Sequence, residues 1–134
     1  MANEAKLVIE LAPPIPFTCA DGAGIEKGTL LTMSDPMTAA ATSTKEAVIA
    51  GIAAAEKIAS DGNTKIPVYR QGIFKVTASG SITCGDALIS STGGTNLVET
   101  AGVNAEDIVG IALETASNSE TMLIELKPFT MNLA

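Results

Sequence analysis

The segment ITCGDALISS (residues 82–91) decides the fold, because a matching segment, IEKGTLLTMS (residues 25–34), occurs earlier in the chain. In both segments an apolar residue and a two-residue spacer lead to a glycine, and a short apolar run follows. The two glycines, Gly28 and Gly85, lie 57 residues apart. A glycine before such a run is typical of a turn that opens a strand. The chain therefore repeats one strand-forming unit.

The match continues beyond these two segments. The stretch VIAGIAAAEKIASDGNT (48–64) corresponds to IVGIALETASNSET (108–121), and Gly51 and Gly110 lie 59 residues apart. Two such copies predict an all-β fold, a compact β-barrel-like or β-sandwich domain built from two pseudo-repeated β-units. Each copy closes with an alternating run typical of a half-buried strand: KIPVYRQ (65–71) and TMLIELK (121–127).

One segment permits two interpretations. Ser43–Glu46 has the form of a helix capping box, and the alanines that follow it favour helix. The corresponding stretch of the second copy, residues 107–114, is rich in β-branched residues and contains a central glycine, which favours a strand. We therefore predict a strand over residues 47–54, followed by one helical turn near residues 55–59.

The Gly85-Asp86 pair raises the question of catalysis. Gly28 and Gly85 are predicted to supply the turn conformation that other residues resist, and Asp86 to hydrogen-bond the backbone of its turn. The first copy has Thr29 at the position of Asp86, and a threonine hydroxyl makes such bonds more weakly. A catalytic aspartate is not expected where the other copy carries threonine. Both pairs are therefore interpreted as structural turns.

The first twenty residues differ from the remainder. A loosely alternating strand is followed by prolines that disfavour both helix and ladder pairing. The segment is either a frayed terminus or an extended N-terminal arm that adds to a neighbouring sheet. We predict an arm over residues 1–20, a single β-domain over residues 21–134, and a fold that survives deletion of residues 2–16. The candidate contact residues are Leu7, Val8, Ile9, Leu11, Pro13, Pro14 and Pro16.

Composition argues against several classes of function. The 134 residues carry a net charge of −7 and only 3% aromatic residues, so neither a basic groove nor a stacking platform for nucleic acid is expected. The chain has no histidine, which removes the commonest general base and metal ligand. Two cysteines, Cys19 and Cys84, are compatible with free thiols or with one disulfide. No signal peptide or membrane-spanning segment is recognised, so we expect synthesis in the cytoplasm.

No motif points to an enzyme or to a cofactor. The stretch GAGIEKGT (22–29) superficially resembles a phosphate-binding loop but lacks the Gly-Lys-Ser/Thr ending. Carboxylate pairs such as Glu106 and Asp107 are interpreted as solvated surface. A carrier domain would need an exposed lysine on a tight hairpin, and Lys65 and Lys75 lie in or beside predicted strands. We expect no catalytic residue, no metal and no cofactor.

Three segments resemble the small capsid decoration, or cement, proteins of tailed bacterial viruses. The resemblance covers roughly residues 22 to 128, and its signatures are structural. The segments are GTLLTM, YRQGIFKVTASGSITCGDALIS and IVGIALETASNSETMLIELKP.

The resemblance implies a β-barrel-like body on the outer surface of an icosahedral capsid. Such proteins form homotrimers at local threefold positions, bridge subunits of the major capsid protein and reinforce the mature shell. It also implies synthesis in the host cytoplasm and a final place in the virion. Two other readings stay open: a small carrier or small-molecule-binding module of a larger complex, and an enzyme that acts through carboxylates alone.

Overall fold

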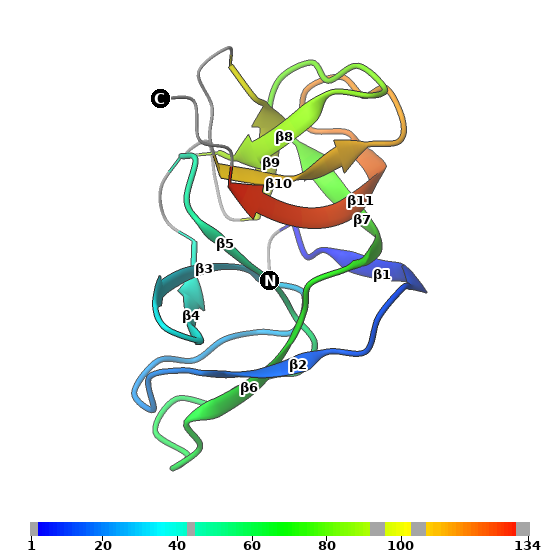
Figure 1. Cartoon of the computed structure of the whole chain (residues 1–134). Coiled ribbons are helices and arrows are strands. Elements are labelled where there is room, and N and C mark those ends of the chain that lie inside the picture. Colours follow the sequence, from blue (N-terminus) through cyan, green and yellow to red (C-terminus); the bar gives the residue numbers. More distant parts are fainter. Residues whose placement is uncertain (1–2, 43–44, 92–95, 103–106, 131–134) are drawn as a thin grey trace.

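The computed structural model describes residues 3–42, 45–91, 96–102 and 107–130. Within these ranges the protein is all-β, as predicted, with eleven strands and no helix (Figure 1). The strands are β1 (Lys6–Glu10), β2 (Ile15–Thr18), β3 (Leu30–Asp35), β4 (Thr38–Ala41), β5 (Ile49–Ala53), β6 (Lys65–Tyr69), β7 (Gly72–Ala78), β8 (Ala87–Ser90), β9 (Leu97–Thr100), β10 (Asp107–Ala112) and β11 (Thr121–Thr130).

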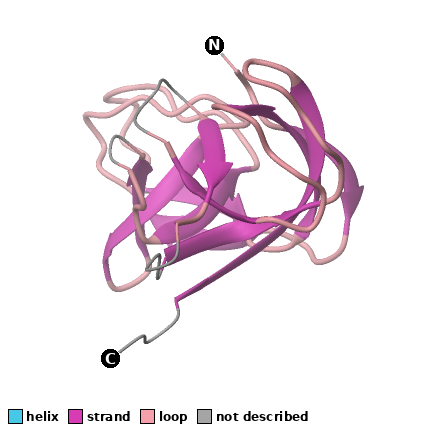
Figure 2. Cartoon of the chain, turned by 90° about the horizontal axis from the view of Figure 1, so that it is seen from above, coloured by secondary structure: helices cyan, strands magenta, loops and turns pink. Residues whose placement is uncertain are grey.

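The strands form two closed barrels of five strands each. The first barrel has the order β2-β4-β3-β5-β6, and the second has the order β7-β9-β8-β10-β11. Each barrel closes through one short parallel pair, β2 with β4 and β7 with β9, while the other pairs are antiparallel. Figure 2 shows curved strands in the body of the molecule and loops around its periphery. The prediction of two pseudo-repeated β-units is therefore confirmed.

Equivalent hydrogen bonds occur at equivalent positions of the two barrels, which also have the same strand order. The amide of Gly28 donates to the carbonyl of Ala53 at 2.9 Å, and the amide of Gly85 donates to that of Ala112 at 2.8 Å. Because equivalent turns are fixed by equivalent backbone bonds, the repeat seen in the sequence is a repeat of backbone geometry. The isolated bridges repeat too, as Ile25 with Lys57 and Ile82 with Ala116.

Two matched glycines allow the neighbouring strands to approach closely. A Cβ atom at Gly51 would overlap the carbonyl oxygen of Tyr69, and one at Gly110 would overlap that of Glu125. Any side chain would therefore separate β5 from β6 in the first barrel and β10 from β11 in the second. The glycine in the middle of each apolar run is thus a requirement of barrel closure.

The ambiguous segment is resolved by this pairing. The predicted strand over residues 47–54 is confirmed as β5, which pairs with both β3 and β6. The predicted helical turn near residues 55–59 is wrong, because Lys57 instead forms a bridge with Ile25 in an extended loop. Ladder bonds on both sides outweigh the helix preference of the alanines. Ser43 and Thr44 of the apparent capping box lie outside the described residues.

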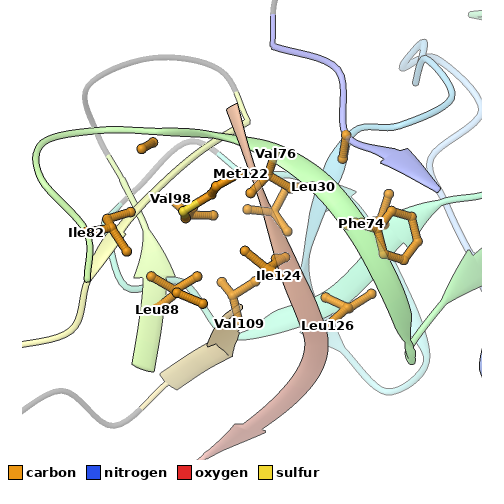
Figure 3. Close-up of a cluster of buried hydrophobic side chains, with 14 of the residues drawn as sticks. Leu30, Phe74, Val76, Ile82, Leu88, Val98, Val109, Met122, Ile124 and Leu126 are labelled. Carbon is orange, nitrogen blue, oxygen red and sulfur yellow. The ribbon is translucent and has the colours of Figure 1, made fainter. Parts of the chain in front are cut away.

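A hydrophobic core joins the two barrels. Leu30, Ile49 and Ile52 of the first barrel belong to the same buried cluster as Phe74 and the apolar side chains of β11. Figure 3 shows Leu30 and Phe74 in this cluster, together with Val76, Ile82, Leu88, Val98, Val109, Met122, Ile124 and Leu126. A second cluster fills the first barrel alone: Phe17, Cys19, Ile25, Leu31, Ala39, Ala50, Ala53, Ile66 and Val68.

The N-terminal residues pair within the chain. β1 lies antiparallel to β7, and β2 is a strand of the first barrel, where Phe17 is buried. Residues 6–10 and 15–18 are thus extended, but β2 is part of the body. Deletion of residues 2–16 would remove half of β2 and open the first barrel, so the expectation that the fold survives this deletion needs correction.

Candidate interaction surface

Large apolar side chains are exposed along the N-terminal segment. Half of the exposed large hydrophobic residues in the described part of the chain belong to it: Leu7, Val8, Ile9, Leu11 and Ile15. Their exposed fractions lie between 38% and 53%. Scattered apolar residues are ordinary on a surface, but five exposed ones within residues 7–15 make this segment the candidate interaction surface. The remaining five are Met37, Val48, Ile58, Leu113 and Phe129.

β1 is an edge strand with one side unpaired. Its inner side pairs with β7, from Lys6 opposite Lys75 to Glu10 opposite Gly72. The register shifts at Val8, which has no Cα partner on β7, so the strand carries a bulge there. Since both barrels are closed, β1 is the only described strand that leaves a whole side free (Figure 1).

The base of β1 is anchored at the junction of the two barrels. The Tyr69 side chain of β6 lies near the Glu10 carboxylate of β1. Burial, followed by the charge and hydrogen bond of Glu10, raises the pKa of Tyr69. The Tyr69 ring meets Phe74 of β7 edge to face, with 5.7 Å between ring centroids. β1 is therefore held on a fixed support.

The three prolines of the predicted contact set lie in two different parts of the structure, the β1–β2 connection and strand β2. Pro13 and Pro14 lie between β1 and β2, with Pro13 exposed and Pro14 partly buried. Pro16 lies within β2 and faces Pro67 of β6, so neither residue of that pair has an amide to donate. The structure brings Leu7, Val8 and Ile9 together on β1 and leaves Pro16 in the barrel wall.

The Gly-Asp turn is a backbone device. Gly28 and Gly85 have φ values of 86° and 95°, in the left-handed region that favours glycine. Asp86 accepts a hydrogen bond from the Thr83 amide at 3.0 Å and another from the Thr100 hydroxyl at 3.0 Å. The carboxylate thus joins its own turn to β9.

The first copy uses the same turn with the opposite polarity. The Thr29 hydroxyl donates to the Glu26 carbonyl at 2.7 Å, three residues back in the chain. The Asp86 carboxylate accepts a hydrogen bond from the amide three residues earlier in the chain. The Thr29 hydroxyl instead donates a hydrogen bond to the carbonyl three residues earlier. Both side chains are engaged with the backbone that they shape.

Sequence reasoning missed a buried lysine. The Lys57 side chain is fully buried, and its ammonium donates to the carbonyls of Asp21 at 2.9 Å and Ile58 at 2.8 Å. It also donates to the Asp61 carboxylate at 2.8 Å, with an Asp21 carboxylate oxygen at 3.4 Å. This network closes one end of the first barrel. Lys57 is one of three lysines between the Asp-Gly dipeptides at residues 21–22 and 61–62, so the sequence did not distinguish it.

The hydrogen bonds and charges of this network shift the pKa values of Lys57 and Asp61. Burial lowers the pKa of Lys57, but the hydrogen bonds and charges of Asp61 and Asp21 outweigh it, so the pKa is raised overall. The pKa of the Asp61 carboxyl is lowered, first by the hydrogen bond from Lys57 and then by the Asn63 amide. Both charged forms are thus favoured by the fold.

The two cysteines are free thiols in different environments. Cys19 is buried and Cys84 is exposed. Burial raises the pKa of the Cys19 thiol, which makes it less reactive. Across the described ranges, no group of three or more Cys, Asp or Glu side chains is arranged to hold a metal ion. The same ranges contain no helix long and apolar enough to cross a membrane.

A solved structure with a similar fold comes from a bacterial virus. The crystal structure of the N base of head fiber gp8.5 in bacteriophage phi29 superposes with a TM-score of 0.57 at 16% sequence identity. The alignment covers 88% of this chain and 98% of that chain. At this identity the likeness establishes the fold alone. No curated protein matches the chain.

A family profile provides the assignment. The profile of phage cement proteins matches residues 10–128, which include every strand of both barrels apart from the last two residues of β11. Of β1 the match includes Glu10 alone. The resemblance noted in the sequence is thereby confirmed. This chain belongs to the phage cement protein family and is a structural protein of the virion that binds the capsid.

Proposed function

We propose that this protein decorates the outer surface of an icosahedral capsid, bridges neighbouring subunits of the major capsid protein and stabilises the mature shell. The observation that carries the contact is the run of exposed apolar side chains on β1, which stands on a body with no other free strand among those described. Membership in the cement family supports a binding role, and it favours a protein without enzymatic activity.

The contact segment is the N-terminal one. The two barrels, from β2 onward, position it, and β1 presents it to the capsid or to a neighbouring copy. Apolar side chains exposed by 40% to 53% can be buried there without unfolding the barrels. The proposed contact residues are Leu7, Val8, Ile9, Leu11, Pro13, Pro14 and Pro16.

We also propose a homotrimer on the shell, as the resemblance implies. One edge strand offers a small contact, and three linked copies engage several sites at once, so avidity raises the overall affinity. Preferential binding to the mature lattice stabilises that state by mass action. The protein is made in the host cytoplasm and joins the capsid there.

Nothing in the structure favours the carrier alternative. The Lys65 ammonium donates to the Thr18 hydroxyl at 3.2 Å across the β2–β6 ladder, and Lys75 lies within β7. Neither lysine stands at the tip of a hairpin, where a modified lysine would have to swing.

The test is cosedimentation with mature and precursor capsids from the same virus. The parent protein is expected to bind mature capsids saturably. Leu7→Ser with Ile9→Ser should weaken binding by about tenfold or more, because burial of two apolar side chains is lost. Val48→Ser with Leu113→Ser is the matched control, since both residues are 40% exposed and lie outside the segment.

Each result has a separate meaning. Absence of parent binding to either capsid would overturn the cement role. Parent-like binding by the Leu7→Ser, Ile9→Ser variant would leave that role standing and remove β1 from the contact.

A further inference from the structure

The sequence of β1 is complementary to itself when reversed. The strand reads Lys6-Leu-Val-Ile-Glu10, with opposite charges at its ends and apolar residues between them. We infer that β1 pairs antiparallel with β1 of a second copy of this chain, about a twofold axis at Val8. This pairing rests on the proposed function only in that the shell brings copies close together.

The free side of β1 can accept a strand. All five residues are exposed, and their unpaired backbone groups point away from β7. An edge strand is a template for pairing with another chain, and the short length, the bulge and the lysine of β1 restrict which chains can pair with it. A twofold contact uses the same surface on both copies, so each residue meets its mirror position.

The side chains match in one orientation only. In antiparallel pairing centred on Val8, Lys6 lies opposite Glu10 of the second copy, and Leu7 lies opposite Ile9. Opposite charges and apolar pairs at facing positions both stabilise a ladder. Parallel pairing in register would place lysine against lysine and glutamate against glutamate, which is unfavourable.

The residue of β7 opposite Lys6 is also a lysine, so an acidic residue on the other side of β1 would stabilise Lys6. Lys6 lies opposite Lys75 within the chain, and both side chains are exposed. Like charges at facing positions destabilise a ladder. Glu10 lies opposite Gly72, which contributes no charge, and its neighbour Tyr69 is uncharged. A second copy would supply a carboxylate to Lys6 and an ammonium group to Glu10 at both ends.

The bulge favours an identical partner. An extra residue at Val8 increases the local twist of β1, so a flat strand from another protein fits its edge poorly. A second β1 carries the same twist at the same central position. The result is a continuous sheet across two copies, which joins neighbouring assemblies on the shell and does not itself build a trimer.

Charge reversal tests the register directly. Lys6→Glu places two glutamates opposite each other, and Glu10→Lys places two lysines opposite each other. Each variant alone should self-associate about tenfold more weakly than the parent. An equimolar mixture of the two variants should associate like the parent, because every facing pair is again of opposite charge. The Lys6→Glu, Glu10→Lys double variant should do the same.

Sedimentation velocity over a concentration series up to about 1 mM measures this association, and far-UV circular dichroism confirms that each variant folds. Recovery in the mixture supports the pairing. A mixture that associates no better than either variant alone overturns it. In that case, retained capsid binding by the parent would still support the proposed function.

Cross-linking tests the position of the axis. Val8→Cys in a Cys84→Ser background places two thiols at facing positions, where a disulfide can form. We expect a covalent dimer on mild oxidation, both in solution and on mature capsids. Ile58→Cys in the same background is the control, since Ile58 is 70% exposed and lies outside β1. Failure of Val8→Cys to cross-link in either setting, or equal cross-linking by the control, overturns the inference.

Discussion

The two barrels have the same strand order and the same turns, but different side chains hold the corresponding loops at their ends. In the first barrel a buried ammonium group, that of Lys57, closes the loop between β5 and β6. In the second barrel Ala116 occupies the matching bridge position. The side chains of Asn118 and Glu120 hold that loop by accepting hydrogen bonds from the amides of Gly80 and Ser117. Matched glycines and turns therefore specify the barrel, while loop side chains are free to diverge. The predictions below test this division, from the largest expected effect to the smallest.

The matched glycines should be equally indispensable. Gly51→Ala and Gly110→Ala should each destabilise the protein by about 4 kcal/mol or more, because the new methyl group meets the backbone oxygen of a neighbouring strand. The measurement is the free energy of unfolding in urea. Gly62→Ala is the control for a glycine with open space around it, although its φ of 83° carries its own cost. An unchanged stability for either barrel variant would contradict the equivalence.

Two phenylalanines should separate the barrel core from the shared core. Phe17→Ala and Phe74→Ala should each cost about 3 to 5 kcal/mol, the range for a fully buried phenylalanine. Phe17 packs within the first barrel, and Phe74 packs in the cluster that joins both barrels. Hydrogen exchange should therefore rise mainly in β2 to β6 for Phe17→Ala and in both barrels for Phe74→Ala. Identical exchange patterns would argue against two separate clusters.

The buried lysine should make the first barrel sensitive to pH. The depressed pKa of Asp61 gives a stabilising contribution that is complete above the unfolded carboxyl value of about 3.9 and is lost as the pH falls through the folded pKa. The raised pKa of Lys57 gives a contribution that is complete below about 10.4 and is lost as the pH rises through the folded pKa.

Lys57→Met should remove both of these dependences and lower the urea midpoint at neutral pH, because Asp61 loses its partner. Urea midpoints across pH 2 to 11 measure this, and Lys65→Met is the control for an exposed lysine. The reading fails if parent and Lys57→Met have parallel pH profiles.

Exchange of the turn residues should have the smallest effect. Asp86→Thr introduces the residue of the first copy and should cost about 1 kcal/mol, because the Thr83 amide loses a charged acceptor in an exposed turn. Asp86→Ala should cost slightly more. Thermal unfolding midpoints measure the difference, and a loss of several kcal/mol would indicate a role beyond the turn.

Much of the fold could be predicted because each repeated unit has a short, continuous sequence pattern. A glycine turn followed by a short apolar run leaves the same mark in residues 25–34 and 82–91, and the family signatures lie in these elements. Closure of the barrels could not be predicted, because the parallel pairs are too short to leave a pattern. β2 meets β4 at Thr18 and Thr38, which are twenty positions apart in the chain.

The candidate surface was predicted in part. The apolar run on β1 was visible in the sequence, but its pairing with β7 depends on residues more than sixty positions away. Phe17 gives the clearest lesson. It follows three prolines and was assigned to the arm, yet it is buried in a barrel, because the β2–β6 ladder tolerates the facing prolines Pro16 and Pro67.

Barrel closure has a consequence for a protein that accumulates in many copies on one particle. In polymer terms, a chain with two free strand edges is a bifunctional monomer, and such monomers grow into fibrils without limit. Closure of both barrels leaves one such edge, on β1, among the described strands. A monofunctional monomer terminates any growth after a single addition. Crowding on a capsid therefore favours contacts between two copies through β1, and a single free edge does not extend such a pair into an amyloid-like stack.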